Sequence, residues 1–143
     1  MQIQKLDVSH IEALQKIYDQ QFGVEAWTKE QILSAFSNQA VAFYGIFDKE
    51  NLVSFASVLV SVDDINLLDI ATLNNYKNKG YAKALLKFLI SLKQPNQTIS
   101  LEVKSKNIPA INLYNSFGFK TLNVRKKYYK DCDDALCMFL LNE

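Results

Sequence analysis

A polar loop that leads into a helix is the first candidate for chemistry in this sequence. An apolar run over residues 67–72 passes into a polar stretch over residues 73–79, and an amphipathic helix follows Gly80. Free N–H groups at the start of a helix, together with the helix dipole, bind anions. Gly80 and the small Ala82 leave room for a phosphate group near the backbone. The loop therefore predicts a phosphate site, with positive charge from Lys77, Lys79 and Lys83.

The spacing of residues in this loop matches no specific phosphate-binding motif, so the prediction depends on the position of the loop between a strand and a helix. Its single glycine forms neither a Walker loop nor the G-x-G-x-x-G fingerprint of dinucleotide-binding proteins. Taken alone, the pattern is explained more simply by an ordinary turn.

Glu102 is the first candidate for acid–base chemistry. A predicted strand over residues 98–103 places it opposite an apolar face formed by Ile99, Leu101 and Val103. Periodicity alone favours a solvated strand residue without a catalytic role.

Tyr114 is the second candidate for acid–base chemistry. It lies on the apolar stripe of a predicted helix over residues 109–117, so periodicity is consistent with a core residue. An aromatic ring can pack in a core and still present its hydroxyl group to a site, so the two interpretations are compatible.

Other reactive residues are scarce. A Ser-His-Asp or Cys-His arrangement would have to rest on the one histidine, His10, which is expected to be solvated in the first turn of a helix. A disulfide framework or a four-ligand zinc site needs more cysteines than Cys132 and Cys137. We therefore expect two free thiols, no metal, and acid–base chemistry by carboxylates and tyrosines.

Hydrophobic periodicity predicts the elements that position these residues, in the order β-α-α-β-β-β-α-β-α-β-β. Strands are expected at residues 2–6, 40–48, 52–61, 65–72, 98–103, 120–129 and 134–141. Capping boxes are expected at Ser9-His10-Ile11-Glu12 and Thr28-Lys29-Glu30-Gln31, with Trp27 and Ile32 as a hydrophobic staple. Gly118 suits a left-handed helix end, with Phe119 as its returning contact. The fold class predicted is α/β (α+β), a sandwich around one mixed sheet.

Composition limits the classes of protein that remain. The 143 residues are 49% hydrophobic and 22% charged, which suits a single domain over residues 1–143. A net charge of +1 gives no strong field for nucleic acid or an anionic membrane. No apolar run approaches the about 18 residues of a membrane span, and the first residues lack the apolar core of a signal peptide. We expect a cytoplasmic protein that binds neither nucleic acid directly nor a membrane.

Two segments resemble the GNAT superfamily of acetyltransferases. Lys77-x-x-Gly80-x-Ala82 is similar to the Q/R-x-x-G-x-G/A motif, which cradles the pyrophosphate of coenzyme A. The run from Leu101 to Phe119 is similar to the family pattern L-E-V-R-x-S-N-x-x-A-x-x-L-Y-x-x-x-G-F. The resemblance implies a mixed, mostly antiparallel sheet flanked by about four helices, with acetyl-CoA as co-substrate.

The resemblance also assigns roles to single residues. It implies that Glu102 is the general base and that Tyr114 is the general acid for the coenzyme A thiolate. The residues that it implies for coenzyme binding are Ile70, Ala71, Thr72, Lys77, Asn78, Lys79, Gly80, Tyr81, Ala82, Lys83 and Asn107. Asn107 could equally be only a helix cap.

Ser105 and Lys106 stand where the family pattern has a residue and then Ser, and four positions in and near the phosphate loop also depart from the pattern. Lys77 replaces Gln or Arg, Ala82 replaces the commoner Gly, Thr72 replaces Val, and Asn74 stands where Pro is frequent. A lysine neutralises phosphate as a point charge but cannot make the two-pronged contact of arginine. We expect coenzyme binding to persist, with lower affinity.

The C-terminal half is similar to the ribosomal-protein alanine N-acetyltransferases of this superfamily. The similarity includes Arg125-Lys126-Lys127-Tyr128-Tyr129, and it places Tyr128 and Tyr129 beside the acceptor groove. It implies that the acceptor is a protein N-terminus, namely an alanine of a small-subunit ribosomal protein. Two alternatives remain open at this point: an acetyltransferase for lysine side chains or small-molecule amines, and an acetyl-CoA-binding module without catalysis.

Overall fold

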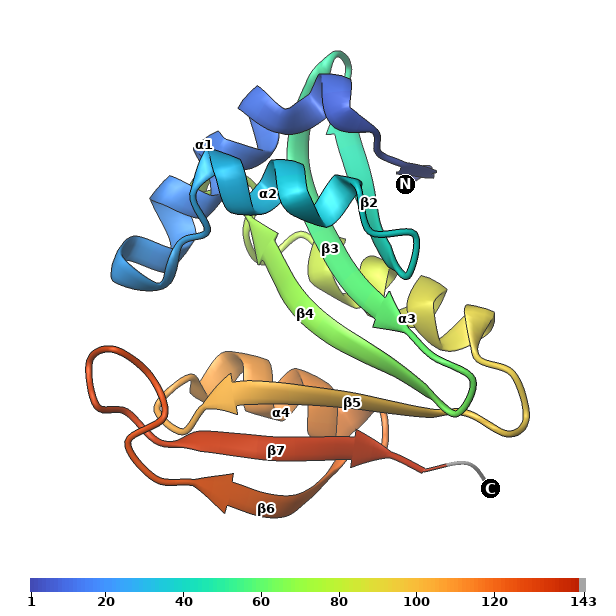
Figure 1. The fold of residues 1–143 in the computed structure, drawn as a ribbon, viewed down its shortest axis with the longest axis vertical. Helices are drawn as coiled ribbons and strands as arrows, with labels where there is room; N and C mark the ends of the chain where they lie inside the picture. Colours follow the sequence, from blue (N-terminus) through green and yellow to red (C-terminus); the bar gives the residue numbers. More distant parts are fainter. Residues whose placement is uncertain (142–143) are drawn as a thin grey trace.

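The computed structural model of the protein describes residues 1–141 (Figure 1). Its strands are β1 (Ile3–Lys5), β2 (Val41–Asp48), β3 (Asn51–Val60), β4 (Asp64–Thr72), β5 (Thr98–Lys104), β6 (Lys120–Arg125) and β7 (Ala135–Leu140). Its α-helices are α1 (Ile11–Phe22), α2 (Lys29–Phe36), α3 (Tyr81–Leu92) and α4 (Ile108–Ser116). Short 3-10 turns lie at η1 (Val8–His10), η2 (Gly23–Glu25) and η3 (Asn74–Tyr76).

The seven strands form one sheet in the order β1-β2-β3-β4-β5-β7-β6. Neighbouring strands are antiparallel except for β4 and β5, which are parallel. The mixed, mostly antiparallel sheet and its flanking helices confirm the predicted fold class.

Two apolar cores hold the helices on opposite faces of the sheet. Helices α1 and α2 pack on one face through buried residues such as Leu14 and Ile32. Helices α3 and α4 pack on the other face, where Leu85 and Leu86 meet Ile99 and Leu101. The predicted alternation along β5 is confirmed, because its apolar side chains are all buried in this second core. No helix within residues 1–141 is long and apolar enough to cross a membrane.

The helix caps confirm one prediction and correct another. Thr28 caps α2 in the predicted capping box with Gln31. The Ser9 cap is wrong, because a 3-10 turn precedes α1 and its capping residue is Asp7. The Asp7 carboxylate accepts from the Ser9 N–H at 2.9 Å, and His10 Nδ1 accepts from the Asp7 N–H at 3.0 Å. The Asp7 carboxylate, two residues before Ser9, thus provides the capping hydrogen bond that Ser9 was expected to provide.

The end of α4 is a Schellman motif, as the sequence predicted. Gly118 has a φ of 94°, and its N–H donates to Asn115 O. The Phe119 N–H donates to Tyr114 O, and the two rings lie 5.8 Å apart. The motif therefore fixes the last turn of α4, which carries Tyr114.

Strand β6 is shorter than predicted. It ends at Arg125, so residues 126–129 belong to the turn between β6 and β7. Lys127 has a φ of 51°, and its N–H donates to the Asp134 carboxylate at 3.0 Å instead of to β7. Tyr128 and Tyr129 are consequently turn residues and not strand residues.

Strands β4 and β5 pair for only part of their length. The parallel pairing runs from Asp64–Thr98 to Leu67–Leu101. Two polar bonds join the strands there: Thr98 Oγ1 donates to Asp64 at 2.6 Å, and Asn66 Nδ2 donates to Ser100 Oγ at 2.9 Å. Beyond this segment the strands part (Figure 1).

A β-bulge in β4 coincides with this point of separation. Val58 of β3 pairs with Leu67 and Ser57 pairs with Asp69, so Leu68 has no partner in β3. Because side chains alternate along a strand, one extra residue reverses which face the following side chains occupy. Leu67 and Ile70 therefore pack with the α3–α4 core, whereas Ala71 packs with the α1–α2 core.

Candidate active site

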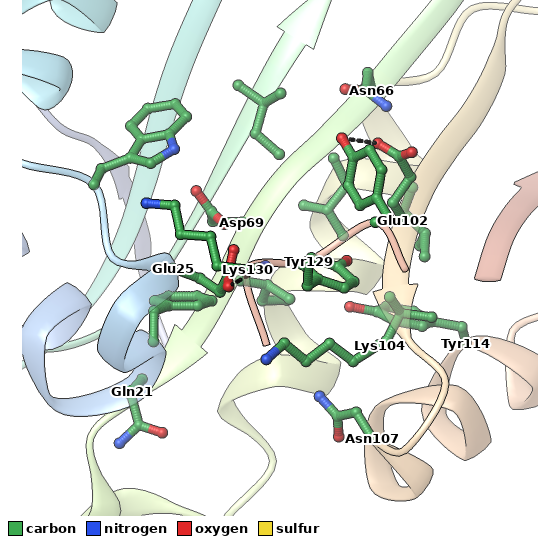
Figure 2. Close-up of a pocket in the computed structure, with 18 residues that line it drawn as sticks. Gln21, Glu25, Asn66, Asp69, Glu102, Lys104, Asn107, Tyr114, Tyr129 and Lys130 are labelled. Atoms are coloured by element: carbon green, nitrogen blue, oxygen red, sulfur yellow. Dashed lines mark hydrogen bonds between the residues drawn. The ribbon is translucent and has the colours of Figure 1, made fainter. Parts of the chain in front are cut away.

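The parting of β4 and β5 opens a cavity of about 670 Å³ (Figure 2). Its walls also include the end of α1, η2, α4 and the turn between β6 and β7. Its polar lining residues are Gln21, Glu25, Asn66, Asp69, Glu102, Lys104, Asn107, Tyr114, Tyr128, Tyr129 and Lys130.

Glu102 lines this cavity from β5, and both of its carboxylate oxygens are held. Arg125 Nε lies 2.9 Å from Oε2. The Tyr128 hydroxyl donates to Oε1 at 3.3 Å, which is the dashed line at Glu102 in Figure 2. The Arg125 guanidinium lies 5.5 Å from the centre of the Tyr128 ring, so the three side chains form one cluster. The cluster fixes the carboxylate and leaves it partly exposed to the cavity, at 30% of its side-chain surface.

Tyr114 lines the same cavity from α4. Its ring is buried, with 4% exposure, and Figure 2 shows its hydroxyl directed toward the cavity. Burial raises the pKa of Tyr114 above its ordinary value, so the hydroxyl keeps its proton at neutral pH. A packed ring with a protonated hydroxyl at the cavity suits a proton donor.

Asp69 is a cavity residue for which the sequence pattern predicted no role. The Tyr18 hydroxyl donates to Asp69 Oδ2 at 2.7 Å, and burial raises the pKa of the Asp69 carboxyl to about 7. Trp27 stacks on the Tyr18 ring at 5.7 Å and lines the cavity as well. A lone acidic residue within the apolar run 67–72 was the available signal.

The turn between β6 and β7 forms the opposite wall of the cavity. Tyr128, Tyr129 and Lys130 all reach the lining, which brings the two predicted acceptor-side tyrosines together with Glu102. The Lys130 N–H donates to the Glu25 carboxylate at 2.8 Å, although the two residues are 105 apart in sequence. This bond joins the turn to η2 across the cavity, and no local pattern could have shown it.

The predicted phosphate loop lies outside the cavity lining, at the start of α3. Gly80 precedes the helix with a φ of 89°, and Asn78 is also left-handed at 62°. Helices α2 and α4 have side-chain caps, but α3 has none. Within residues 1–141, the first-turn amides of α3 are left without a protein acceptor. Such amides suit an anion.

The charged residues of this loop are available to a ligand. Lys77, Lys79 and Lys83 are exposed, and none of them forms an ion pair with another residue of the described chain. Lys79 lies over the Tyr76 ring at 5.5 Å. Tyr81 and Ala82 form the first turn of α3 and are partly buried.

The other predicted coenzyme residues lie at the end of β4 and at the start of α4. Ile70, Ala71 and Thr72 end β4, in the part that no longer pairs with β5, and Ile70 reaches the cavity lining. Asn107 caps α4 by accepting from the Ala110 N–H at 3.3 Å, and it also lines the cavity. Both interpretations of Asn107 are therefore compatible with its position.

The described part of the chain contains no set of side chains that could bind a metal ion. Residues 1–141 contain no group of three His, Cys, Asp or Glu side chains that could hold an ion. Cys132 is exposed and Cys137 is buried, and both are free thiols.

The arrangement suits proton transfer between a base and an acid that line one cavity. A fixed carboxylate on β5 and a protonated phenol on α4 face the same cavity. An uncapped helix start with three free lysines lies beyond the end of β4 and could hold a phosphate-bearing ligand.

Comparison with known proteins agrees with this geometry. The chain matches the acetyltransferase (GNAT) family over residues 11–119. It is 35% identical over 111 residues to the ribosomal protein bS18-alanine N-acetyltransferase of Escherichia coli, covering 73% of this chain and 75% of that protein. Its identity to the protein of the same name from Haemophilus ducreyi is 33% over 107 residues, covering 72% of each.

Solved structures show the same likeness. The crystal structure of the ribosomal-protein-S18-alanine N-acetyltransferase from Escherichia coli superposes with a TM-score of 0.91 at 28% identity, covering 99% of this chain and 94% of that one. Arabidopsis thaliana NAA60 in complex with acetyl-CoA shares the fold, with a TM-score of 0.87 at 17% identity and 99% coverage of each chain. The resemblance drawn from the sequence is confirmed.

Proposed function

The chain belongs to the GNAT acetyltransferase family, and we propose that it transfers the acetyl group of acetyl-CoA to the N-terminal α-amine of a protein. The proposed acceptor is the N-terminal alanine of a small-subunit ribosomal protein, in the cytoplasm where such proteins are synthesised. The names of the bacterial relatives support this acceptor.

The observation that carries the proposal is the pairing of Glu102 and Tyr114 in one cavity. Glu102 accepts a proton from the acceptor ammonium. The freed nitrogen bonds to the thioester carbonyl carbon, and the carbon–sulfur bond breaks as Tyr114 gives its proton to the sulfur. The nitrogen then loses a second proton, which restores Tyr114, so that one proton is released overall.

The coenzyme side of the site is proposed from the uncapped start of α3. The amides that follow Gly80 would bind the pyrophosphate, with Lys77, Lys79 and Lys83 providing positive charge. The free edge of β4 at residues 70–72 would hydrogen-bond the pantetheine arm, because no strand pairs with that edge beyond Leu67 in the described chain.

Acceptor chemistry favours an α-amine over a lysine side chain. Their ordinary pKa values are about 8 and about 10.4, so the α-amine is neutral roughly a hundredfold more often at neutral pH. A single carboxylate base such as Glu102 is better matched to the group that loses its proton more easily.

Three peptides that share one body test the acceptor. The first has a free N-terminal alanine, the second has a blocked N-terminus and an internal lysine, and the third has a bulky first residue. We expect the alanine peptide to have the highest kcat/KM, measured by release of the coenzyme A thiol. Comparable kcat/KM for the blocked lysine peptide would overturn the α-amine assignment, and equal values for alanine and the bulky residue would overturn the alanine preference.

A further inference from the structure

Asp69 faces the cavity because of the bulge at Leu68. Without that extra residue, strict alternation from Leu67 would direct Asp69 into the α3–α4 core. The bulge turns it toward α1, where it meets Tyr18, and into the cavity lining. Figure 2 shows Asp69 on the β4 side of the cavity, across from Glu102 on the β5 side.

The three carboxylates of the cavity differ in what holds them. Glu102 is paired with Arg125, and Glu25 accepts the Lys130 N–H. Asp69 accepts only from the neutral phenol of Tyr18, and no ion pair within residues 1–141 includes it. Lys104 and Lys130 share the lining, but Lys104 is bound to Asp131 at 2.6 Å and Lys130 forms no ion pair with Asp69.

A carboxylate in this position is costly unless a cation reaches it. Partial burial disfavours the charged form, and a neutral phenol does not compensate for the lost solvation of a full negative charge. Ser57 lies directly opposite Asp69 in the ladder, but its buried hydroxyl donates no hydrogen bond to the Asp69 carboxylate. The packing around Asp69 is therefore poorly arranged for stability and well arranged for a cationic ligand that enters the cavity.

We infer that the Asp69 carboxylate binds the α-ammonium group of the acceptor and holds it in the cavity while Glu102 removes its proton. The inference rests on the proposed function, because it needs an amine acceptor. Asp69 and Glu102 then divide the work: the first binds the cation and the second, fixed by Arg125, takes the proton. A hydrogen bond to a charged group is worth enough to change affinity by about tenfold or more.

The test is a binding measurement with coenzyme A bound, so that no transfer can occur. Calorimetry compares a peptide that begins with alanine and the same peptide with the amine replaced by hydrogen, that is, with an N-terminal propionyl group. Wild-type protein should bind the amine peptide about tenfold or more tightly than the propionyl peptide. Asp69→Asn should bind the two peptides with affinities within about twofold of each other. The introduced amide can still accept from Tyr18 and can donate to Ser57, so the fold is maintained.

Asp48→Asn is the matched control, because Asp48 also accepts a tyrosine hydroxyl, from Tyr76 at 2.9 Å, and lies outside the cavity. It should keep the wild-type preference for the amine. Three results would each overturn the inference. The wild-type protein could show no preference for the amine peptide over the propionyl peptide, Asp69→Asn could keep that preference, or Asp48→Asn could lose it as well.

Steady-state kinetics separate this inference from the proposed function. If Asp69 binds the ammonium equally in the ground state and the transition state, Asp69→Asn raises the acceptor KM about tenfold and leaves kcat nearly unchanged. An unchanged KM with full turnover would overturn the role of Asp69 alone. Failure of the wild-type protein to acetylate the amine peptide would overturn the proposed function.

Discussion

Glu102 and Tyr114 meet in the cavity from two different elements, and each is fixed by neighbours that are remote from the other. Arg125 and Tyr128 hold the Glu102 carboxylate, whereas Phe119 and the Schellman motif hold the Tyr114 ring. Fixed acid–base groups are effective because they need no reorganisation during the reaction. The Glu102 carboxylate and the Tyr114 hydroxyl can therefore be replaced separately, provided that the Tyr114 ring is kept.

We predict that Glu102→Gln and Tyr114→Phe each lower kcat by about 10²–10⁴-fold while the Kd of acetyl-CoA changes little. The first removes the proton acceptor, and the second removes the hydroxyl but keeps the ring against Phe119. Glu102→Gln should recover partly at high pH, where the acceptor amine loses its proton unaided. Steady-state kinetics and calorimetry measure the two effects. Wild-type turnover at neutral pH in either variant would contradict the role of that residue.

At the scale of single elements, α3 and α4 differ in how they use glycine. Gly80 lies before the first turn of α3 and Gly118 after the last turn of α4, with nearly equal φ angles of 89° and 94°. A Cβ atom added at Gly80 meets nothing nearer than the Met1 Cε at 3.8 Å, and one added at Gly118 meets Leu140 Cδ1 at 3.6 Å. Both positions have space for a Cβ atom in the folded protein, so the backbone conformation, and at Gly80 also the proposed phosphate ligand, accounts for the glycine.

Gly80→Val should raise the Kd of acetyl-CoA by at least about tenfold, because the side chain occupies the approach to the first-turn amides of α3. Gly118→Val is the control, since it imposes the same left-handed strain of about 1–2 kcal/mol at the far end of another helix. It should lower the melting temperature and leave coenzyme affinity nearly unchanged. Equal affinity in wild type and Gly80→Val would refute the phosphate loop.

For the whole molecule, the cavity exists because the sheet is complete at one end and open at the other. Polar bonds from Asp64 and Asn66 join β4 to β5 where they pair, and beyond Leu67 the strands separate around the cavity. Where the strands separate, carboxylates lie partly buried in the cavity, and partial burial of a charge lowers the stability of the folded state. Asp69 is the carboxylate that we expect to destabilise the folded state in this way.

Asp69→Asn should make the protein more stable at pH 8 and leave it nearly as stable as wild type at pH 4. Burial raises the Asp69 pKa from 3.8 to about 7, so between these values the folded state keeps a proton that the unfolded state has released. Wild-type stability therefore falls as pH rises through this window, by on the order of 4 kcal/mol at most, and the variant lacks this loss. Urea unfolding at both pH values measures the difference, and a gain independent of pH would contradict the explanation.

Features that depend on neighbours in sequence could be predicted from the sequence. The alternation along β5, the capping box of Thr28, the helix end at Gly118 and the start of α3 at Gly80 all follow from contacts within a few residues. Family resemblance added Glu102 and Tyr114, which periodicity alone would have assigned to a solvated strand and a core.

Only the tertiary structure decided which side chains complete the cavity. The bulge at Leu68 depends on how β4 registers with β3, and it reverses the direction of Asp69. Arg125 reaches Glu102 from another strand, and Glu25 meets Lys130 over a separation of 105 residues. Strand register and contacts at such separations result from packing of the whole chain, and a local sequence pattern does not encode them.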